Sequence, residues 1–231
     1  MLLSSLATFE ASAAIEVFLG YVALVAALRA LRRAYIRKLA SRPDVDPHQV
    51  AWMLAFVEFP FMFETGISLG FFSTFAIPSI AATLRATRAF ECACQMRFDD
   101  TNILMHEVGE FGCQSARGMA ALKRINEIHG RHRSIKRDDM LYTLWVFCFE
   151  PVYWVNAYDW RTIDTFEKRM LFQYWRQVGE GLHIADIPRT LEEFEGWGER
   201  YERLQCRSIA SRASRENTMH VIEVRAPTAR P

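Results

Sequence analysis

The feature that most constrains the fold is a long apolar stretch in the middle of the chain, DDMLYTLWVFCFEPVYWVNAY at residues 138–158. A helix drawn through it carries large apolar side chains on every side, so protein rather than water must surround it. We therefore predict a central buried helix. Asp138 or Asp139 is its expected N-cap, and Pro151 is expected to end or bend it.

The segments around this stretch also carry helical signals. Asp164 and Thr190 each precede a helical pattern and have a glutamate three residues later, which is the spacing of a capping box. Apolar residues at helical spacing predict further helices over 101–110 and 114–129, and strand-like alternation occurs only at 220–224. The predicted fold class is therefore all-α.

The N-terminal region reads as one membrane helix. Residues 17–28 carry no charge, and the apolar run reaches back to Ser12 with Glu16 as its only charged residue. This length is close to the lower limit for crossing a bilayer, which takes ~20 mostly apolar residues. Basic residues follow from Arg29 to Lys38, and the positive-inside rule then places the body in the cytosol. The alternative is an amphipathic helix packed on the body.

A proline-containing stretch, SRPDVDPH, separates this helix from the rest of the chain. Prolines and aspartates at this density indicate a turn or a hinge. The predicted organisation is a membrane helix with its basic flank at 1–40, a linker at 41–48, an all-α domain at 49–206 and a polar tail at 207–231.

Charge and cysteine content argue against several classes of protein. The net charge is +1, which provides no general attraction to nucleic acid. The five cysteines are odd in number and include no Cys-x-x-Cys pair, so neither a disulfide framework nor a structural zinc site is expected.

Two short motifs resemble metal sites but lack the partners that those sites need. His106-Glu107-x-x-Glu110 has a glutamate where a zinc-protease helix needs its second histidine. Glu180-x-x-His183 occurs once, whereas a di-iron bundle needs two such pairs on separate helices. We favour neither a metalloprotease nor a di-iron protein.

His129 has two possible roles when it is judged from the residues alone. It ends a predicted helix on the face that carries Met119, Leu122 and Ile125, so its imidazole is expected to face inward. It is then either an ordinary core histidine or an axial ligand of heme, which requires this same placement.

Arg97, Asp100 and Thr101 also allow two interpretations. In a helix, Arg97 and Thr101 share one face and Asp100 lies beside them. The group is either a helix start, with Asp99 or Asp100 as the cap, or a polar patch that binds a ligand.

Four blocks of sequence, taken together, resemble a known family. It joins the bacterial rubber oxygenases (latex clearing proteins) to the fungal mpaB-type ER-bound oxygenases, and the fungal branch is the more similar. The blocks keep their order and spacing, and RFDDTNIL is one of the two most specific. They are the segments 58–90, 97–104, 117–147 and 175–202.

The resemblance implies an all-α helical bundle that encloses a b-type heme, with the iron held by His129. Arg97 and Thr101 match an Arg-x-x-Lys-Thr segment that lies on the heme of the rubber-cleaving members, where they would be catalytic and cofactor-binding. Asp100 replaces the lysine of that segment, so a lysine ligand is not expected here. Asn126, in the same block as His129, is assigned to cofactor binding with them.

The implied function is a heme-dependent oxygenase that uses dioxygen to cleave a C=C bond in an isoprenoid or other lipophilic substrate. The implied location is the endoplasmic reticulum membrane. The alternative is a non-catalytic membrane-anchored helical protein, or a truncated pseudoenzyme, because fungal relatives continue well past the position of Glu202. His183 stands where a small residue is expected, and it could crowd the pocket or add a polar group to it.

Overall fold

A computed structural model describes residues 2–88 and 94–216, with the backbone alone for residues 2–12, 94, 97, 98 and 206–216. The described part contains helices and no strand, so the predicted all-α class is confirmed. The predicted strand-like segment 220–224 lies outside the described residues, as does the tail from residue 217. The chain divides into two compact units, Met1–Asp46 and Pro47–Pro231.

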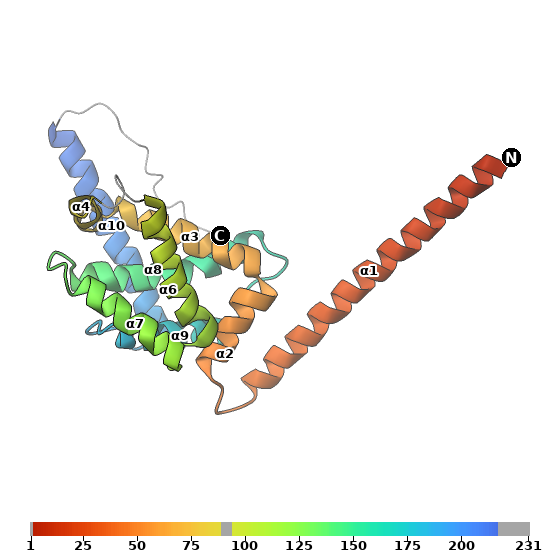
Figure 1. The fold of residues 1–231 in the computed structure, drawn as a ribbon, viewed down its shortest axis with the longest axis horizontal. Helices are drawn as coiled ribbons and strands as arrows, with labels where there is room; N and C mark the ends of the chain where they lie inside the picture. Colours follow the sequence, from red (N-terminus) through yellow and green to blue (C-terminus); the bar gives the residue numbers. More distant parts are fainter. Residues whose placement is uncertain (1, 89–93, 217–231) are drawn as a thin grey trace. The chain divides into compact units, whose positions relative to one another are not determined.

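The first unit is one long helix, α1 (Leu2–Ala40) (Figure 1). Its segment Ala13–Ala40 is long and apolar enough to cross a membrane. Apolar side chains such as Val17, Phe18 and Leu31 are exposed along it. Water is a poor solvent for this surface, whereas the hydrocarbon of a bilayer is a good one.

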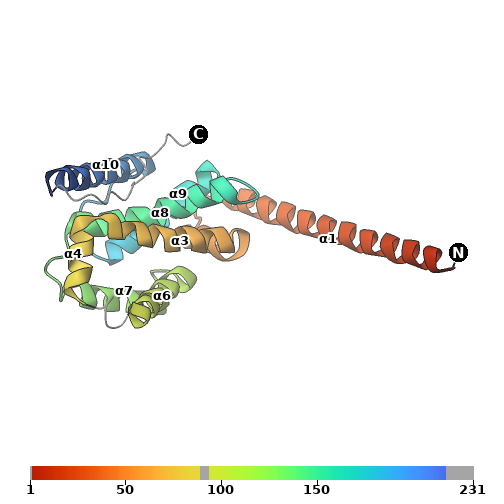
Figure 2. The same ribbon diagram turned by 90° about the horizontal axis from the view of Figure 1, so that it is seen from above.

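The second unit is built around α8 (Arg137–Tyr158), the helix predicted from the apolar stretch. Its buried residues lie on all sides, and Trp145, Val146 and Val155 are among them. α3 (Pro60–Ser73) packs along α8, and α9 (Thr165–Gly181) and α10 (Leu191–Glu216) also contact it. The remaining elements are α2 (Pro47–Trp52), η1 (Met53–Glu58), η2 (Thr74–Ala76), α4 (Pro78–Ala86), α6 (Cys94–Phe111) and α7 (Ala116–His129). Figure 2 shows α10 and the α6–α7 pair on opposite sides of α3 and α8.

Two details of α8 bear on the prediction. Of the two outcomes expected at Pro151, an end of the helix is excluded, because the helix continues through the proline to Tyr158. Its N-cap is Lys136, so the prediction of Asp138 or Asp139 was wrong. Both aspartates lie in the first turn, where the helix dipole favours a negative charge.

Asp139 joins three helices. Its Oδ1 accepts hydrogen bonds from the Ser79 hydroxyl of α4 at 2.6 Å and from the Tyr201 hydroxyl of α10 at 2.7 Å. Burial, together with the bond to this carboxylate, raises the pKa of Tyr201 well above its ordinary value. The Asp139 side chain therefore binds residues of two other helices, although its local sequence suggested that it would cap its own helix.

The two predicted capping boxes are present. At the start of α9, Asp164 accepts a bond from the backbone N–H of Glu167 at 2.9 Å, and the Glu167 carboxylate accepts from that of Asp164 at 2.8 Å. At the start of α10, the Thr190 hydroxyl accepts a bond from the backbone N–H of Glu193 at 3.2 Å, and the Glu193 carboxylate accepts from that of Thr190 at 3.3 Å. Each box satisfies backbone donors that the first turn of a helix leaves open.

Candidate cofactor site

Helices α6 and α7 form a helical hairpin closed by a short turn. Gly112 takes a φ of +83°, a conformation that suits glycine, and Ser115 caps α7 by accepting a bond from the Gly118 N–H at 3.0 Å. A Cβ on Gly118 would come within 2.0 Å of the Gly112 carbonyl oxygen, so glycine permits this close approach. These residues determine where α7 turns back along α6.

The hairpin carries the predicted site residues at its open end. Thr101 on α6 and Asn126 on α7 each lie about 15 Å along their helices from the turn, at a rise of ~1.5 Å per residue. Arg97 and His129 lie about one helical turn further from it. These residues, which are far apart in sequence, thus lie at similar distances from the turn of the hairpin. Their roles toward a cofactor stay predictions.

His129 is the last residue of α7 and is half-buried, with a fully buried Nδ1 atom. Leu122 and Ile125 on the preceding turns are buried, as predicted. Met119 is 56% exposed, so the prediction that it shares this inward face was wrong. The buried face of α7 runs through Gly118, Ala121, Leu122 and Ile125, beside Met119 and not through it, and the imidazole lies at the end of this apolar strip.

Asn126 already has a partner within the fold. Its side-chain amide donates a hydrogen bond to the carbonyl oxygen of Gly181, at the C-terminal end of α9, at 2.9 Å. A Cβ on Gly181 would come within 2.7 Å of Leu122, so α7 and α9 are in close contact at this point. The described role of Asn126 is therefore to join these two helices.

The segment around Arg97 lies inside a helix. α6 begins at Cys94, upstream of Arg97, so the alternative in which Asp99 or Asp100 caps the helix was wrong. Asp100 is exposed and Thr101 is half-buried, whereas the Arg97 side chain lies outside the described residues. Arg97 is the fourth residue of α6, and Asp100 and Thr101 follow in the next turn.

The His106-Glu107-x-x-Glu110 motif lies on the surface of the same helix. Glu107 accepts two hydrogen bonds from the guanidinium of Arg117, which hold the pKa of its carboxyl below the ordinary value. His106 is exposed, with its ring 6.2 Å from that of Phe56, and Glu110 is exposed as well. Among the described residues, these side chains form no group of three that could hold a metal ion.

His183 caps a helix. It lies just past the end of α9 with a φ of +58°, and its N–H donates to the Glu180 carbonyl, while the N–H of Ile184 donates to that of Gly179. This pair of bonds is a Schellman motif, whose left-handed position favours glycine. The imidazole is exposed. Within residues 2–88 and 94–216, no three His, Cys, Asp or Glu side chains converge in a way that could hold a metal ion.

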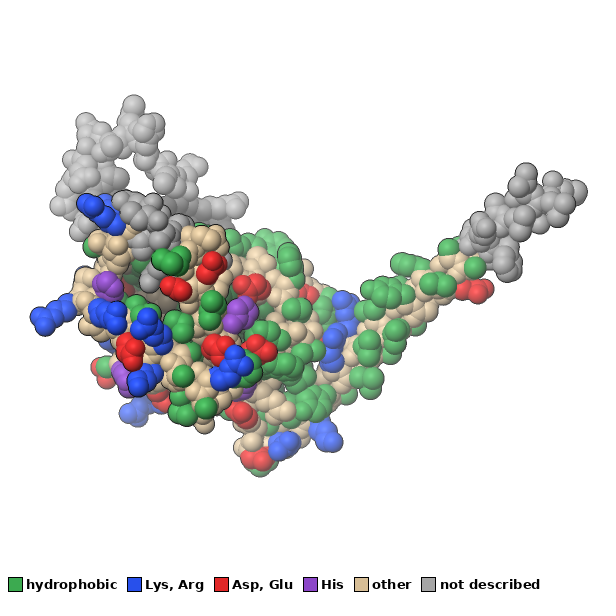
Figure 3. Space-filling model, in the orientation of Figure 1, with side chains coloured by type: hydrophobic (Ala, Val, Ile, Leu, Met, Phe, Trp, Pro, Cys, Tyr) green, Lys and Arg blue, Asp and Glu red, His purple; other side chains and the backbone are tan. Residues whose placement is uncertain are grey.

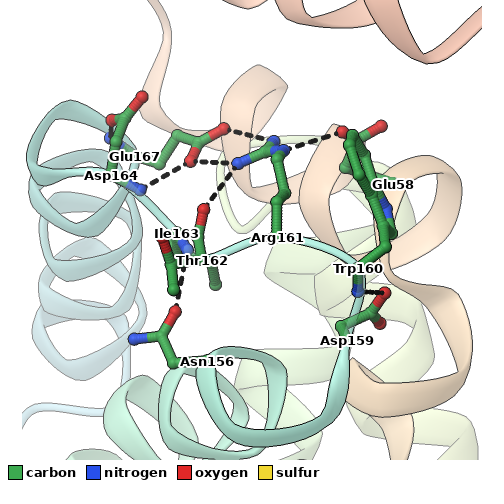
Figure 4. Close-up of polar contacts among 9 residues, drawn as sticks. All are labelled: Glu58, Asn156, Asp159, Trp160, Arg161, Thr162, Ile163, Asp164 and Glu167. Atoms are coloured by element: carbon green, nitrogen blue, oxygen red, sulfur yellow. Dashed lines mark hydrogen bonds and ion pairs between the residues drawn. The ribbon is translucent and has the colours of Figure 1, made fainter.

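A buried charge cluster around Arg161 was missed by sequence reasoning (Figure 4). Arg161 donates to Glu167 through two nitrogens at 2.7 and 2.9 Å, to Glu58 at 3.0 Å and to the Thr162 carbonyl at 3.0 Å. Its side chain is 9% exposed, and those of the two glutamates are almost fully buried. Its guanidinium also lies 4.7 Å from the centre of the Phe59 ring. The capping box of α9 was a visible signal for Glu167, but no spacing rule connects Arg161 to Glu58.

Comparisons with known proteins give a consistent result. A family model described as ER-bound oxygenase mpaB/B'/Rubber oxygenase, catalytic domain, matches residues 79–231. The chain is similar to ER-bound oxygenase mpaB of Penicillium brevicompactum, with 29% identity over 210 residues that cover 80% of this chain and 54% of the relative. It is similar to ER-bound oxygenase mpaB of Penicillium roqueforti (strain FM164), with 28% identity over 217 residues that cover 83% and 73%. The chain spans about half the length of the Penicillium brevicompactum relatives that it matches. No solved structure matches it.

Proposed function

The chain belongs to the catalytic-domain family of the ER-bound oxygenases mpaB/B' and the rubber oxygenases, and we propose that it is a heme-dependent oxygenase for a lipophilic substrate. The proposed reaction is cleavage of a C=C bond in an isoprenoid or similar chain with dioxygen. The observation that carries this proposal is the open end of the α6–α7 hairpin, where a half-buried histidine ends an apolar strip level with a polar segment.

The residues of this end fit heme better than they fit a bare metal ion. A zinc ion needs three or more protein ligands, whereas a porphyrin supplies four nitrogens and needs one axial ligand from the protein. His129 provides one imidazole, and buried Leu122 and Ile125 provide apolar surface on the turns before it. When bound, heme supplies an iron centre that activates dioxygen.

The remaining residues of the site have roles that their chemistry allows. Arg97 would bind a heme propionate, because a guanidinium pairs well with a carboxylate. Thr101 would donate a hydrogen bond to an oxygen atom in the site. Asp100 would place an acidic side chain at the position of the lysine of the rubber-cleaving members.

We also propose that α1 anchors the protein in the endoplasmic reticulum membrane with its body in the cytosol. The relatives are named ER-bound, and the apolar segment Ala13–Ala40 supports a spanning helix. The basic residues from Arg29 to Lys38 support the orientation, since such residues favour the cytosolic side. An anchor suits a substrate that dissolves in lipid.

The test is a visible spectrum of the purified full chain supplied with heme. We expect a Soret band in wild type and its loss or displacement in His129→Ala. His132→Ala is the matched control and should keep the band, because His132 lies in the loop after α7 between Arg131 and Arg133.

Far-UV circular dichroism should show equal helix content in all three proteins. A wild-type protein that folds but takes up no heme would contradict the proposal and favour the non-catalytic alternative. A band that is identical in wild type and His129→Ala would rule out His129 as the ligand.

A further inference from the structure

We propose that the exposed apolar side of α2, η1 and α3 rests in the headgroup region of the membrane as a second contact beside the anchor helix. We call this surface the elbow face. It is defined by five large apolar side chains that lie exposed in the body, namely Trp52, Phe56, Phe61, Leu69 and Phe72. The proposal rests on the proposed anchoring by α1.

Helix α3 has two different sides. Phe61, Leu69 and Phe72 recur at intervals of eight and three residues, which places them on one side of the helix. Phe61 is 73% exposed and Phe72 is 56% exposed. Single exposed apolar residues are ordinary, but a row of them on one helix side marks an interaction surface.

The opposite side of α3 packs against α8 in the core. A Cβ on Gly66 would come within 2.5 Å of the Pro151 backbone, and one on Gly70 within 2.6 Å of the Val146 side chain. The two glycines therefore let α3 lie directly against α8, and Phe63 is buried on the same side. This contact fixes which side of α3 faces outward.

Charge is nearly absent from the outward side. The sequence has no lysine or arginine from Pro47 to Leu84, and its acidic residues there are Glu58 and Glu64. Glu58 is buried against Arg161, which leaves Glu64 as the exposed charge. Figure 3 shows hydrophobic side chains gathered over the part of the body formed by α2, η1 and α3, while basic side chains gather at the other end.

The geometry favours a surface contact over a second span. The pair Pro47–Glu58 and Pro60–Ala76 is apolar enough to count as a broken span, but its halves are bent by 106°. One side of α3 also packs on α8, so lipid cannot surround it. Tryptophan and phenylalanine on a partly exposed helix side suit the headgroup region, where amphipathic helices sink ~5–10 Å into the boundary with the acyl chains.

The chain itself holds the elbow face near a bilayer. Six residues, Ser41 to Asp46, separate the end of α1 from the start of α2. A fully extended segment of this length reaches ~20 Å at about 3.3 Å per residue. The basic end of α1, from Arg29 to Ala40, adds ~18 Å at about 1.5 Å per residue, so α2 begins within ~40 Å of the bilayer when α1 spans it, and the elbow face is the first surface that follows. This covalent continuity is our reason for choosing lipid as the partner over a second copy of the chain.

The test measures tryptophan fluorescence of the full chain in phosphatidylcholine nanodiscs, with and without lipid brominated on its acyl chains. Three variants each add one tryptophan, and the wild-type signal is subtracted. Phe61→Trp reports the elbow face, and Phe18→Trp reports α1. Leu204→Trp, at a 64% exposed apolar position on α10, is the matched control. We expect bromine to quench Phe61→Trp clearly but less strongly than Phe18→Trp, which lies in the spanning segment, and to leave Leu204→Trp unchanged.

A companion variant uses a native tryptophan and does not depend on introducing a new one. Trp52→Phe should remove part of the bromine-quenched fluorescence of the wild-type protein, because Trp52 is a native member of the elbow face.

Quenching of Phe18→Trp without that of Phe61→Trp would overturn the elbow contact while the anchor stands. Protection of Phe61→Trp from both bromine and aqueous iodide would show that protein covers the face, which also overturns it. Absence of quenching at Phe18→Trp would contradict the anchor itself.

Discussion

The Arg161 cluster and the open end of the α6–α7 hairpin are both rich in polar groups, but the groups differ in how far they are buried. In the cluster, a guanidinium and two carboxylates are buried and bonded to one another. At the hairpin end, Asp100 is exposed and His129 is half-buried. Charges that satisfy one another contribute to folding and specificity, whereas the polar groups at the hairpin end are the ones that we propose for ligand binding.

Helix α9 connects the two regions. Glu167 in its first turn binds Arg161, and the Gly181 carbonyl at its end accepts from Asn126 of the hairpin. Substitutions along α9 and its partners therefore test whether the first region is structural and the second is adaptable.

The largest effect is expected from Arg161→Met. The change leaves Glu58 and Glu167 buried without their cation, and removal of one partner from a buried ion pair costs about 3–5 kcal/mol. Denaturant unfolding monitored by circular dichroism would measure this loss. Arg124→Ala, which removes an exposed pair with Glu127, should cost less than about 0.5 kcal/mol. Equal effects of the two changes would show that the cluster is not a structural centre.

If Arg161→Met does not fold, Arg161→Lys provides a milder test. Lysine keeps the charge but cannot donate to both oxygens of Glu167 in the planar arrangement of a guanidinium. We expect a smaller decrease in the free energy of unfolding than for Arg161→Met, and wild-type stability would contradict the importance of the paired bonds.

An intermediate effect is expected from Asn126→Ala. The variant loses the hydrogen bond to the Gly181 carbonyl, and the free energy of unfolding without heme should fall by about 1 kcal/mol. Gln114→Ala, at an exposed position in the turn, is the control and should change little. If Asn126 acted only on a cofactor, its removal would weaken heme uptake and leave the heme-free stability unchanged.

The smallest effect, with the opposite sign, is expected from His183→Gly. Glycine takes the left-handed conformation at this position without strain, so the heme-free protein should be more stable by about 1 kcal/mol in thermal unfolding. Ala185→Gly lies two residues later without a positive φ, and it should be neutral or destabilising. A destabilised His183→Gly would mean that the imidazole makes a contact that supports the fold.

Local sequence predicted much of the fold because helix signals act over short distances. The apolar stretch identified α8, and the glutamates three residues after Asp164 and Thr190 identified the starts of α9 and α10. Errors arose where a distant partner decided the outcome. Asp139 is a residue type that often caps helices, but hydroxyl groups from α4 and α10 bind it instead. Met119 is apolar and lies near helical spacing, but the buried face of α7 passes through its neighbour Gly118 instead.

The candidate site shows the same division. The order of blocks around Arg97 and His129 identified the family from sequence, and His129 was recognised as the end of a helix. Sequence could not show that Asn126 reaches the end of α9, because Gly181 lies on another helix. It also could not show how far His129 and His183 are buried, although each lies at or just past the end of a helix. Their surroundings differ: one has a buried ring nitrogen, and the other is exposed on a left-handed cap.

The sequence by itself determined the all-α class, the apolar N-terminal helix, the capping boxes and the family, because each depends on neighbouring residues or on the order of short blocks along the chain. Tertiary structure alone decided that Arg161 joins Glu58 to Glu167, that Asn126 binds the end of α9 and that one side of α3 stays exposed. Those outcomes depend on which surfaces meet when the helices pack, and a contact between distant residues leaves no periodic mark in the sequence.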